Sequence, residues 1–345
     1  MKKISFIIPV FNCDRYLESC IENIFCIGLS NYEVILVDDG STDDSYRICR
    51  ELSHNYSQIV AIHQENRGAA SARNRGIMQS KGKFIVFLDA DDSFDSNGLS
   101  ELLARMDFDE SIDVAIYGMT FDYYKNGICY RSDDISYPLP GLKKEFHWRS
   151  ELSDMYDSNA LSSVCNKVFR KDIIDRERLL FNEKMFIYED LEFFLRYLSF
   201  CKNIYMSSEC IYHYRQSEDE GNAGRRLKRI PHIASLVDQI EAAAEGLIQV
   251  SEDNQVATQV GHILFSLYLV LAREKIAVSN KDEIGQICDE FRHWMENRKL
   301  VIDAEQQKFV DLLMKRKVTQ IMIHRTYVSV RHWIAIRVKA FIRKK

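Results

Sequence analysis

The chain has 345 residues, of which 46% are hydrophobic and 28% are charged, and this composition excludes a disordered or collagen-like protein. The length is sufficient for one large domain or two ordinary ones with a substantial core. The formal net charge is −5, but residues 315–345 contain ten Lys or Arg and neither Asp nor Glu. The rest of the chain is therefore acidic, and the basic end is typical of a segment that binds a surface.

Nine cysteines are scattered without a C-x-x-C pair or a metal-like spacing, which favours reduced thiols in a cytosolic compartment. The first residues, MKKISFIIPVFNCD, have two lysines before an apolar run, as a signal peptide does. Pro9, Asn12 and Asp14 interrupt the apolar run, so a buried first strand is the better interpretation. The longest later apolar stretch, ILFSLYLVLA from Ile263, is expected to be too short to span a bilayer.

The first 120 residues alternate between short apolar runs and helical patterns. The runs cover residues 4–10, 34–37, 59–62 and 84–88, and helix candidates lie between them, over 14–26, after STDDS and in GAASARNRGIMQSKG. Short strands that are apolar throughout and alternate with helices predict an α/β fold with a mostly parallel sheet covered on both faces. Ligands bind beyond the carboxyl ends of such strands. This rule selects three polar places, at residues 9–12, 38–41 and 89–92.

The second half of the chain has a different pattern. Residues 112–215 mix short runs with aromatic-rich turns and one helix candidate, EDLEFFLRYLSF. After residue 221 strand signals disappear and the pattern becomes helical and charged. We therefore predict a first domain over residues 1–220 and a helical region over 221–345, ending in a basic helix at about 315–345.

The stretch FIVFLDADDSF leads an apolar strand into three carboxylates, Asp89, Asp91 and Asp92. Neighbouring carboxylates raise one another's pKa unless a cation or hydrogen bonds offset the repulsion. Two carboxylates with one residue between them can share Mg²⁺ or Mn²⁺, which keeps other positions for water and phosphate oxygens. The alternative for an isolated D-x-D is a solvated acidic turn.

Two further stretches have the same character. In ILVDDGSTDDS, Asp39 is placed to accept a hydrogen bond from a base or a ribose hydroxyl, or else to cap the next helix. NRGAASARNRG supplies small residues and three arginines, Arg67, Arg73 and Arg75. An arginine there could hold a base carbonyl or balance the carboxylates, and the alternative is a solvated helix face.

Seven motifs then occur in order over residues 3–217: SFIIPVFN, VILVDDGSTDDS, NRGAASARNRG, FIVFLDADD, CNKVFRKDII, YEDLEFFLRYL and IYHYRQS. Together they resemble the successive motifs of family 2 glycosyltransferases with the GT-A fold. The resemblance implies a sugar-nucleotide donor, most often UDP-linked, and a divalent metal. The residues that it places around the uridine are Pro9, Phe11, Asp39, Asn66 and Arg73. Phe11 stands where the family commonly has Tyr.

The resemblance also implies the chemistry of the remaining motifs. Asp89 lies near the ribose and the metal, Asp91 is the main metal ligand, and Asp92 assists by hydrogen bonding. Asp190 is the base that takes the proton from a sugar hydroxyl, because such a hydroxyl is a poor nucleophile at neutral pH. Direct attack by that hydroxyl inverts the anomeric carbon. Without the resemblance, the Glu189–Asp190 pair could equally be an acidic pair favoured by the helix dipole.

Three of the motifs contain residues for which the resemblance implies alternative or supporting roles. Glu189 orients the loop or binds the acceptor, and Asn166 and Lys167 contact the acceptor or brace the base. Arg215 and Ser217 are placed to hold the diphosphate, whereas His213 is either a further metal ligand or a packed residue. The segment EDEGNAGR follows where relatives usually have a Ser-rich run, which puts closure over the diphosphate in doubt.

The end of the chain, TYVSVRHWIAIRVKAFIRKK, places apolar residues at spacings of three and four with basic residues beside them. Basic amphipathic helices with Trp and Phe lie flat on anionic membranes. We expect peripheral association with the cytoplasmic face of the inner membrane rather than nucleic-acid binding. Packing on the enzyme or on a dimer partner is the alternative. A lipid-diphosphate-linked glycan in capsule, O-antigen or exopolysaccharide synthesis is the acceptor that the resemblance suggests.

Two other functions are alternatives to glycosyl transfer. A phosphotransferase or phosphatase with Asp89 as nucleophile would carry its D-x-D on the first strand and would leave Asp39 and Asp190 without roles. A non-catalytic nucleotide-binding protein would be expected to lack either the D-x-D or the Glu-Asp pair. The sequence does not identify the sugar.

Overall fold

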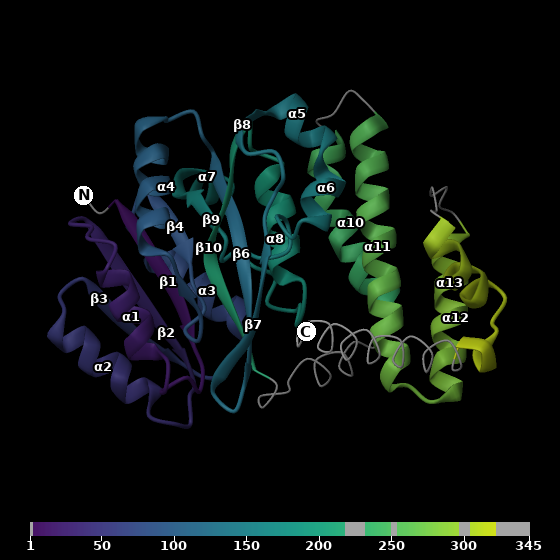
Figure 1. Ribbon diagram of the computed structural model, residues 1–345, viewed down its shortest axis with the longest axis horizontal. Helices are drawn as coiled ribbons and strands as arrows, with labels where there is room; N and C mark the ends of the chain where they lie inside the picture. Colours follow the sequence, from purple (N-terminus) through teal and green to yellow (C-terminus); the bar gives the residue numbers. More distant parts are fainter. Residues whose placement is uncertain (1–2, 218–231, 250–253, 297–303, 322–345) are drawn as a thin grey trace, which may run out of the picture. The chain divides into compact units, whose positions relative to one another are not determined.

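The structure is a computed structural model that describes residues 3–217, 232–249, 254–296 and 304–321 (Figure 1). Contacts divide the chain into two units, residues 1–221 with 242–259 and residues 222–241 with 260–345. The first unit thus continues past the predicted boundary near residue 220 by taking in residues 242–259.

The first unit is built on a ten-stranded sheet with the order β3-β2-β1-β4-β9-β6-β10-β5. Its first four strands are parallel. They are β1 (Ile4–Val10), β2 (Tyr32–Asp39), β3 (Ile59–Gln64) and β4 (Phe84–Phe87). Phe6, Ile7 and Ile8 are all fully buried, and successive side chains of a strand point to opposite faces. Both faces of the sheet are therefore covered, as the continuous apolar runs predict.

Three helices join these strands in the predicted places: α1 (Leu17–Phe25), α2 (Ser45–Asn55) and α3 (Ala69–Gln79). A fourth helix, α4 (Ser96–Phe108), follows β5 and was not predicted. The small residues of NRGAASARNRG let α3 approach the sheet closely. A Cβ added to Gly76 would lie 2.3 Å from Cγ2 of Ile7, so α3 packs against β1 at a distance that only glycine permits.

The second half of the sheet is mixed. Its strands are β5 (Ser93–Phe94), β6 (Val114–Lys125), β7 (Ile128–Ile135), β8 (Gly141–Lys144), β9 (Lys167–Arg170) and β10 (Asn203–Ser217). The four-residue β9 is antiparallel to both β4 and β6, and among the strands of the described residues it alone joins the two halves. β6 and β10 are parallel to each other.

Short helices pack beside this half: α5 (Glu145–Ser150), α6 (Leu152–Asp157), α7 (Lys171–Arg176) and α8 (Glu189–Leu198). The predicted helix EDLEFFLRYLSF is α8. Phe193 is fully buried and stacks on Phe181 with ring centroids 4.1 Å apart. This aromatic packing anchors α8 against the sheet and thereby sets the position of its first residues.

The described residues beyond 231 are helical, as predicted. The helices are α10 (Ile233–Gln249), α11 (Asn254–Val278), α12 (Lys281–Met295) and α13 (Ala304–Met314). A capping box between Asn280 and Glu283 begins α12, and it satisfies two backbone donors at the helix start. The predicted amphipathic stripe over residues 327–341 lies outside the described residues.

One expectation about the helical region is wrong. The apolar stretch from Ile263 belongs to a longer helix, and residues 255–277 are long and apolar enough to cross a membrane by length and composition. Of the apolar window in that helix, 56% is buried within the structure, which is equally typical of a core helix in a soluble protein. The sequence estimate failed because it counted only the uninterrupted apolar residues.

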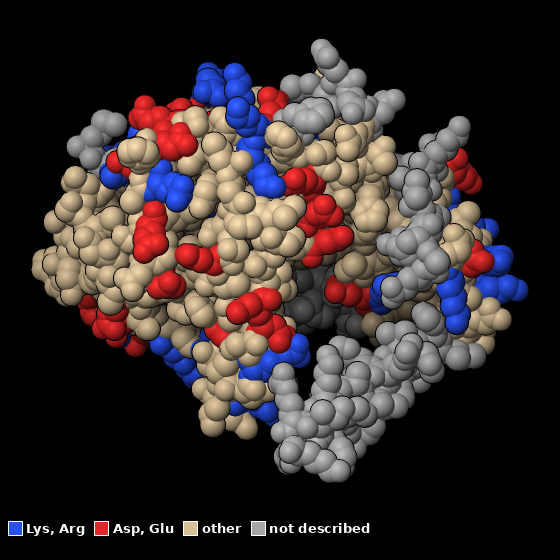
Figure 2. Space-filling model, turned by 45° about the horizontal axis from the view of Figure 1, so that its top comes forward, with Lys and Arg blue, Asp and Glu red and all other residues tan. Residues whose placement is uncertain are grey.

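All nine cysteines are free thiols, as predicted from their count and spacing. On the face shown in Figure 2, Asp and Glu side chains are spread over the described surface with Lys and Arg between them.

Candidate active site

The three polar places selected from the sequence lie at the same edge of the sheet. Val10 pairs with Asp38 and Asp38 pairs with His63, while the end of β4 pairs with Ile7. The carboxyl ends of β1, β2 and β4 are therefore neighbours. Pro9 is half-buried at the end of β1, and the ring of Phe11 is 49% exposed just beyond it. An exposed aromatic side chain beside buried strand ends is suited to contact with a planar base.

Asp39 is buried, and its carboxylate organises the loop before α3. Its Oδ1 accepts from Gln64 Nε2 and from the backbone N–H of Arg67, both at 2.8 Å. Its Oδ2 accepts from the N–H of Gly68 at 2.7 Å. A carboxylate offers about four acceptor sites, so Asp39 retains capacity for one ligand donor. The loop passes so close to Gly40 that a Cβ there would lie 2.8 Å from the backbone nitrogen of Asn66, and the side chain of Asn66 is exposed.

Arg73 joins the two carboxylate motifs of the sequence. Its Nη2 donates to Asp89 Oδ1 at 2.9 Å and its Nη1 donates to Asp190 Oδ1 at 3.0 Å. Glu189 Oε1 lies 3.5 Å from the same Nη1. The guanidinium is only 4% exposed, so these are charge-assisted contacts with little solvent screening. The arginine that was expected beside the uridine thus lies between the D-x-D and the Glu-Asp pair.

Asp190 stands in the first turn of α8. The backbone of Tyr188 is left-handed, with φ of 61°, at the start of the helix. Besides Arg73, the N–H of Val164 donates to Asp190 Oδ2 at 3.3 Å, and the side chain is 17% exposed. Burial raises the pKa of Asp190 to about 7 against the lowering effect of Arg73, and the charges of Glu189 and Asp89 raise it further. A carboxylate with this pKa is suited to accept a proton near neutral pH.

The other two acids of the D-x-D stretch differ in environment. Asp91 is exposed, whereas Asp92 is buried. Asp92 Oδ2 accepts from the hydroxyl of Tyr212 at 2.5 Å, and its Oδ1 accepts from the N–H of Arg215 at 2.7 Å. Burial, with the charges of Asp89 and Asp91, raises the pKa of Asp92 well above its ordinary range. Asp92 therefore ties β10 to the end of β4.

Tyr212 is a residue that the sequence did not single out. It is buried, and its hydroxyl accepts from the N–H of Asp89 at 3.2 Å while it donates to Asp92. One phenol thus joins both acids. No local signal distinguishes it among 17 tyrosines, because its partners lie at least 120 positions away.

The end of β10 holds three of the predicted residues, Arg215, His213 and Ser217. The guanidinium of Arg215 lies over the rings of Tyr124 and Tyr16, at 3.6 and 4.9 Å from their centroids. Its Nε is buried without a hydrogen-bond partner. His213 Nδ1 lies 3.0 Å from Asp122 Oδ2, which leaves Nε2 as the nitrogen for a metal. Ser217 is the last residue of β10.

Asn166 and Lys167 are buried rather than exposed to a cleft. Asn166 Nδ2 donates to the carbonyl of Tyr117 at 3.0 Å, and Lys167 Nζ donates to Asn166 Oδ1 at 2.7 Å. Lys167 has no exposed surface. Of the two roles left open by the sequence, bracing fits this placement and contact with an acceptor does not.

The carboxylates at the end of β4 are compatible with a metal. Within the described residues no group of three or more His, Cys, Asp or Glu forms a ready cation site. Asp89, of which one oxygen is held by Arg73, and the exposed Asp91 supply two hard oxygen donors at one strand end. That donor set suits Mg²⁺ or Mn²⁺, which take one or two carboxylates and complete their shell with water and phosphate oxygens.

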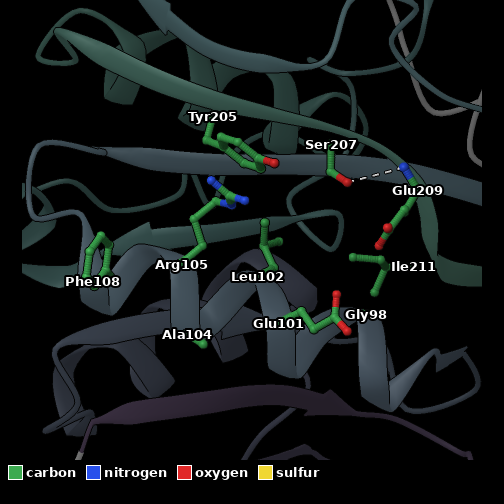
Figure 3. A pocket seen from close by; sticks show the side chains of 10 residues that line it. All are labelled: Gly98, Glu101, Leu102, Ala104, Arg105, Phe108, Tyr205, Ser207, Glu209 and Ile211. Carbon is green, nitrogen blue, oxygen red and sulfur yellow. Dashed lines mark hydrogen bonds between the residues drawn. The ribbon is translucent and has the colours of Figure 1, made fainter.

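A separate cavity of about 500 Å³ lies between α4 and β10 (Figure 3). Arg105 stacks on Tyr205 there, 4.7 Å from the ring centroid, and Phe108 stands at one end. No predicted site residue lines this cavity, so it is distinct from the carboxylate site.

Comparison with known proteins shows which family and which relatives this chain is similar to. Residues 5–175 match the family described as Glycosyl transferase family 2. The chain is 28% identical over 243 residues to the uncharacterized glycosyltransferase EpsJ of Bacillus subtilis (strain 168), covering 69% of this chain and 66% of that protein. It is 31% identical over 237 residues to the minor teichoic acid biosynthesis protein GgaB of the same organism, covering 65% and 24%. The chain thus spans less than two thirds of the length of these relatives.

A solved structure extends the likeness over most of the chain. TarS 1–349 of S. aureus in complex with UDP-GlcNAc superimposes with a TM-score of 0.69 at 17% identity, covering 94% of this chain and 90% of that one. At this identity the likeness concerns the fold, including the helical region after the sheet.

Proposed function

Because the chain belongs to glycosyl transferase family 2 and has the GT-A fold that its motifs predict, we propose that it transfers a sugar from a UDP-linked donor to a hydroxyl of a glycan acceptor. One observation carries the proposal. Asp89 and Asp190 lie 101 positions apart in the sequence, and they are held by the two terminal nitrogens of one buried arginine. The acid that we propose to bind the donor and the acid that we propose to accept the proton are thus held by one guanidinium.

The donor would bind at the carboxyl ends of β1, β2 and β4. Phe11 would lie against the base, and Asp39 would accept from the base through its remaining lone pair. Pro9 and the loop at Asn66 would line the same pocket. The UDP-GlcNAc complex of TarS supports this class of donor by fold. Arg215 has an unpartnered Nε, which supports its proposed role as a donor to the diphosphate.

Asp89 and Asp91 would hold Mg²⁺ or Mn²⁺. When bound, the cation would offset the charge that builds on the diphosphate as the sugar leaves. The protein's own residues would do the rest. Asp190 would accept the proton of the acceptor hydroxyl at Oδ1 or Oδ2 as that oxygen attacks the anomeric carbon, and Glu189 would orient the acceptor. A single displacement of this kind inverts the anomeric carbon, so an α-linked donor would give a β-linked product.

The acceptor and its location belong to the same proposal. Relatives of this chain are named for teichoic acid biosynthesis, which supports a cell-envelope glycan as acceptor. We propose that it is carried on a lipid diphosphate and that the enzyme meets it at the cytoplasmic face of the membrane through residues 315–345. The phosphotransferase alternative requires the D-x-D on the first strand, whereas here it follows β4.

The test is a transfer assay with purified protein, Mn²⁺ and four donors: UDP-glucose, UDP-galactose and their N-acetyl forms. Asp190→Asn should bind UDP as the wild type does but should lose transfer by roughly 10²- to 10⁴-fold, the range expected for a missing general base. Asp172→Asn, which also removes an acid from the first turn of a helix, is the matched control and should retain full activity. A near-wild-type rate for Asp190→Asn would remove that residue as the base.

A further inference from the structure

Lys167 is a fully buried lysine that the proposed reaction does not use directly. Its Nζ donates to the carbonyl of Ser163 and to Asn166 Oδ1, and it lies 4.3 Å from the ring centroid of Phe194. Neither hydrogen-bond partner is a carboxylate, and the side chain has no exposed surface. It therefore cannot touch a sugar or a nucleotide, yet it lies beside the residues that hold Asp190.

The contacts of Lys167 close one turn of the chain, residues 163–166, which we name the base-holding turn. The hydroxyl of Ser163 accepts from the N–H of Cys165 at 3.0 Å. The phenol of Tyr117 donates to the carbonyl of Cys165 at 2.8 Å, and the backbone of Tyr117 exchanges hydrogen bonds with both the backbone and the side chain of Asn166. The turn is thus fixed to β6 on one side and to Lys167 on the other.

The base-holding turn has one contact with the proposed base. The N–H of Val164 donates to Asp190 Oδ2 at 3.3 Å, while Arg73 holds Oδ1. These two donors come from different elements, and together they set the orientation of the carboxylate plane. Placement of the carboxylate matters, because a misplacement of about 1 Å can cost roughly 10²-fold in rate.

We propose that Lys167 is a positioning residue for sugar transfer: by closing the base-holding turn it presents the Val164 N–H to Asp190 and keeps that carboxylate ionised and aimed at the acceptor. The inference rests on the proposed function, since it takes Asp190 as the base.

The brace does not depend on the charge of Lys167. Burial lowers the pKa of Lys167 to about 7, and a neutral amine still has two N–H groups for its two acceptors. The other charged or titratable groups around Asp190 are Arg73 from α3, Asp89 after β4, Glu189 from α8 and Cys165 in the turn. Of these, Arg73 favours the ionised form of Asp190, and the acids oppose it.

The test is the pH dependence of kcat for Lys167→Met, which keeps an apolar stem of similar length and removes the amine. Loss of the Val164 hydrogen bond, which stabilises the carboxylate, disfavours ionised Asp190. We expect the acidic limb of the profile to move up by about 0.5 to 1 pH unit and kcat at neutral pH to fall roughly 10- to 100-fold. The Kd for UDP with Mn²⁺, measured by calorimetry, should stay within about twofold, because the donor pocket is untouched.

Lys171→Met is the matched control. Lys171 lies next to β9, and its Nζ pairs with the exposed Asp175 at 2.6 Å, so its loss should leave the profile unchanged. Tyr117→Phe removes the other side of the same brace, and it should move the limb in the same direction. If Lys167→Met does not fold, the pH profile of Tyr117→Phe tests the proposal in its place.

The outcomes separate the two proposals. If the wild-type enzyme transfers sugar and Lys167→Met and Tyr117→Phe keep its pH profile, the role of Lys167 is overturned and the proposed function stays intact. A wild-type enzyme that transfers no sugar from any of the four donors overturns both. A shifted limb with unchanged UDP binding supports the brace, since a merely structural lysine would alter stability without moving that limb.

Discussion

Asp190 is largely buried, and its two oxygens accept hydrogen bonds from Arg73 and from the N–H of Val164. We expect this environment to determine how activity depends on pH. Its pKa is raised to about 7, so the residue is protonated and unable to accept a proton below that pH. We predict that kcat rises about tenfold per pH unit below 7 and reaches a plateau above it. The measurement is a pH–rate profile with saturating donor and Mn²⁺.

Glu189 tests the cause of this shift. Its charge raises the pKa of Asp190, so Glu189→Gln should move the acidic limb to lower pH, opposite to the effect expected of Lys167→Met. A limb that moves up, or stays in place, would show that Glu189 does not act on Asp190 through its charge.

Arg73 gives a prediction about stability. Replacing it by Met would leave the largely buried Asp190 and the partly exposed Asp89 without their cation, and breaking a buried pair on one side costs about 3–5 kcal/mol. We expect a decrease of that size in the free energy of unfolding, measured by urea denaturation. Arg67→Met is the control, because its pair with Glu183 is exposed and such pairs contribute about 0–1 kcal/mol. Equal effects of the two changes would contradict the central place given to Arg73.

Among the elements, α3 shows how a glycine can be required for packing alone. Gly76→Ala would drive a methyl group into Ile7, and overpacking of a core typically costs about 1–3 kcal/mol. Gly285 in α12 is the matched case, because a Cβ there would meet only the end of the Arg316 side chain, at 3.1 Å. Gly285→Ala should stabilise instead, by up to about 1 kcal/mol from helix propensity. In thermal unfolding, the melting temperature should fall for Gly76→Ala and rise for Gly285→Ala. A rise for Gly76→Ala would contradict the close packing of α3 on β1.

The elements that could be predicted from sequence are those with strong local patterns. The apolar runs of β1 to β4 and the amphipathic α8 are where the periodicity places them, and the D-x-D follows a strand as expected. The position of β9 could not be predicted, because its four residues, KVFR, lack the continuous apolar run that marks the equally short β4, and its neighbours β4 and β6 are distant in sequence. The same reason hid Tyr212 and the bridging position of Arg73: both depend on contacts across more than 100 positions.

For the molecule as a whole, the main prediction concerns attachment to membranes. The described residues end at Ile321, which is buried, so truncation after Ile321 leaves the described helices complete. It removes seven Lys or Arg, each expected to contribute about 1 kcal/mol near an anionic surface. The truncated protein should remain in the supernatant when centrifuged with vesicles of anionic phospholipid at moderate salt, whereas the full chain should sediment.

An activity measurement shows whether truncation affects membrane binding alone. Transfer to a water-soluble acceptor analogue should be the same for the full and the truncated chain, since the proposed catalytic residues all precede residue 218. Unchanged sedimentation after truncation would mean that the basic end packs on protein instead.

The place of β9 also bears on how the chain acquires its fold during synthesis. β1 to β4 are complete once residue 87 has emerged, but the outer edge of β4 pairs only with β9, which ends at residue 170. β6 has no partner in the first four strands either. For the roughly 80 residues made in between, an apolar strand edge stands open, and open edges are sites of aggregation. A chain that pauses on the ribosome or is truncated between residues 88 and 166 should therefore be prone to aggregate. Synthesis of residues 167–170 should remove this tendency, because β9 then covers the edge of β4.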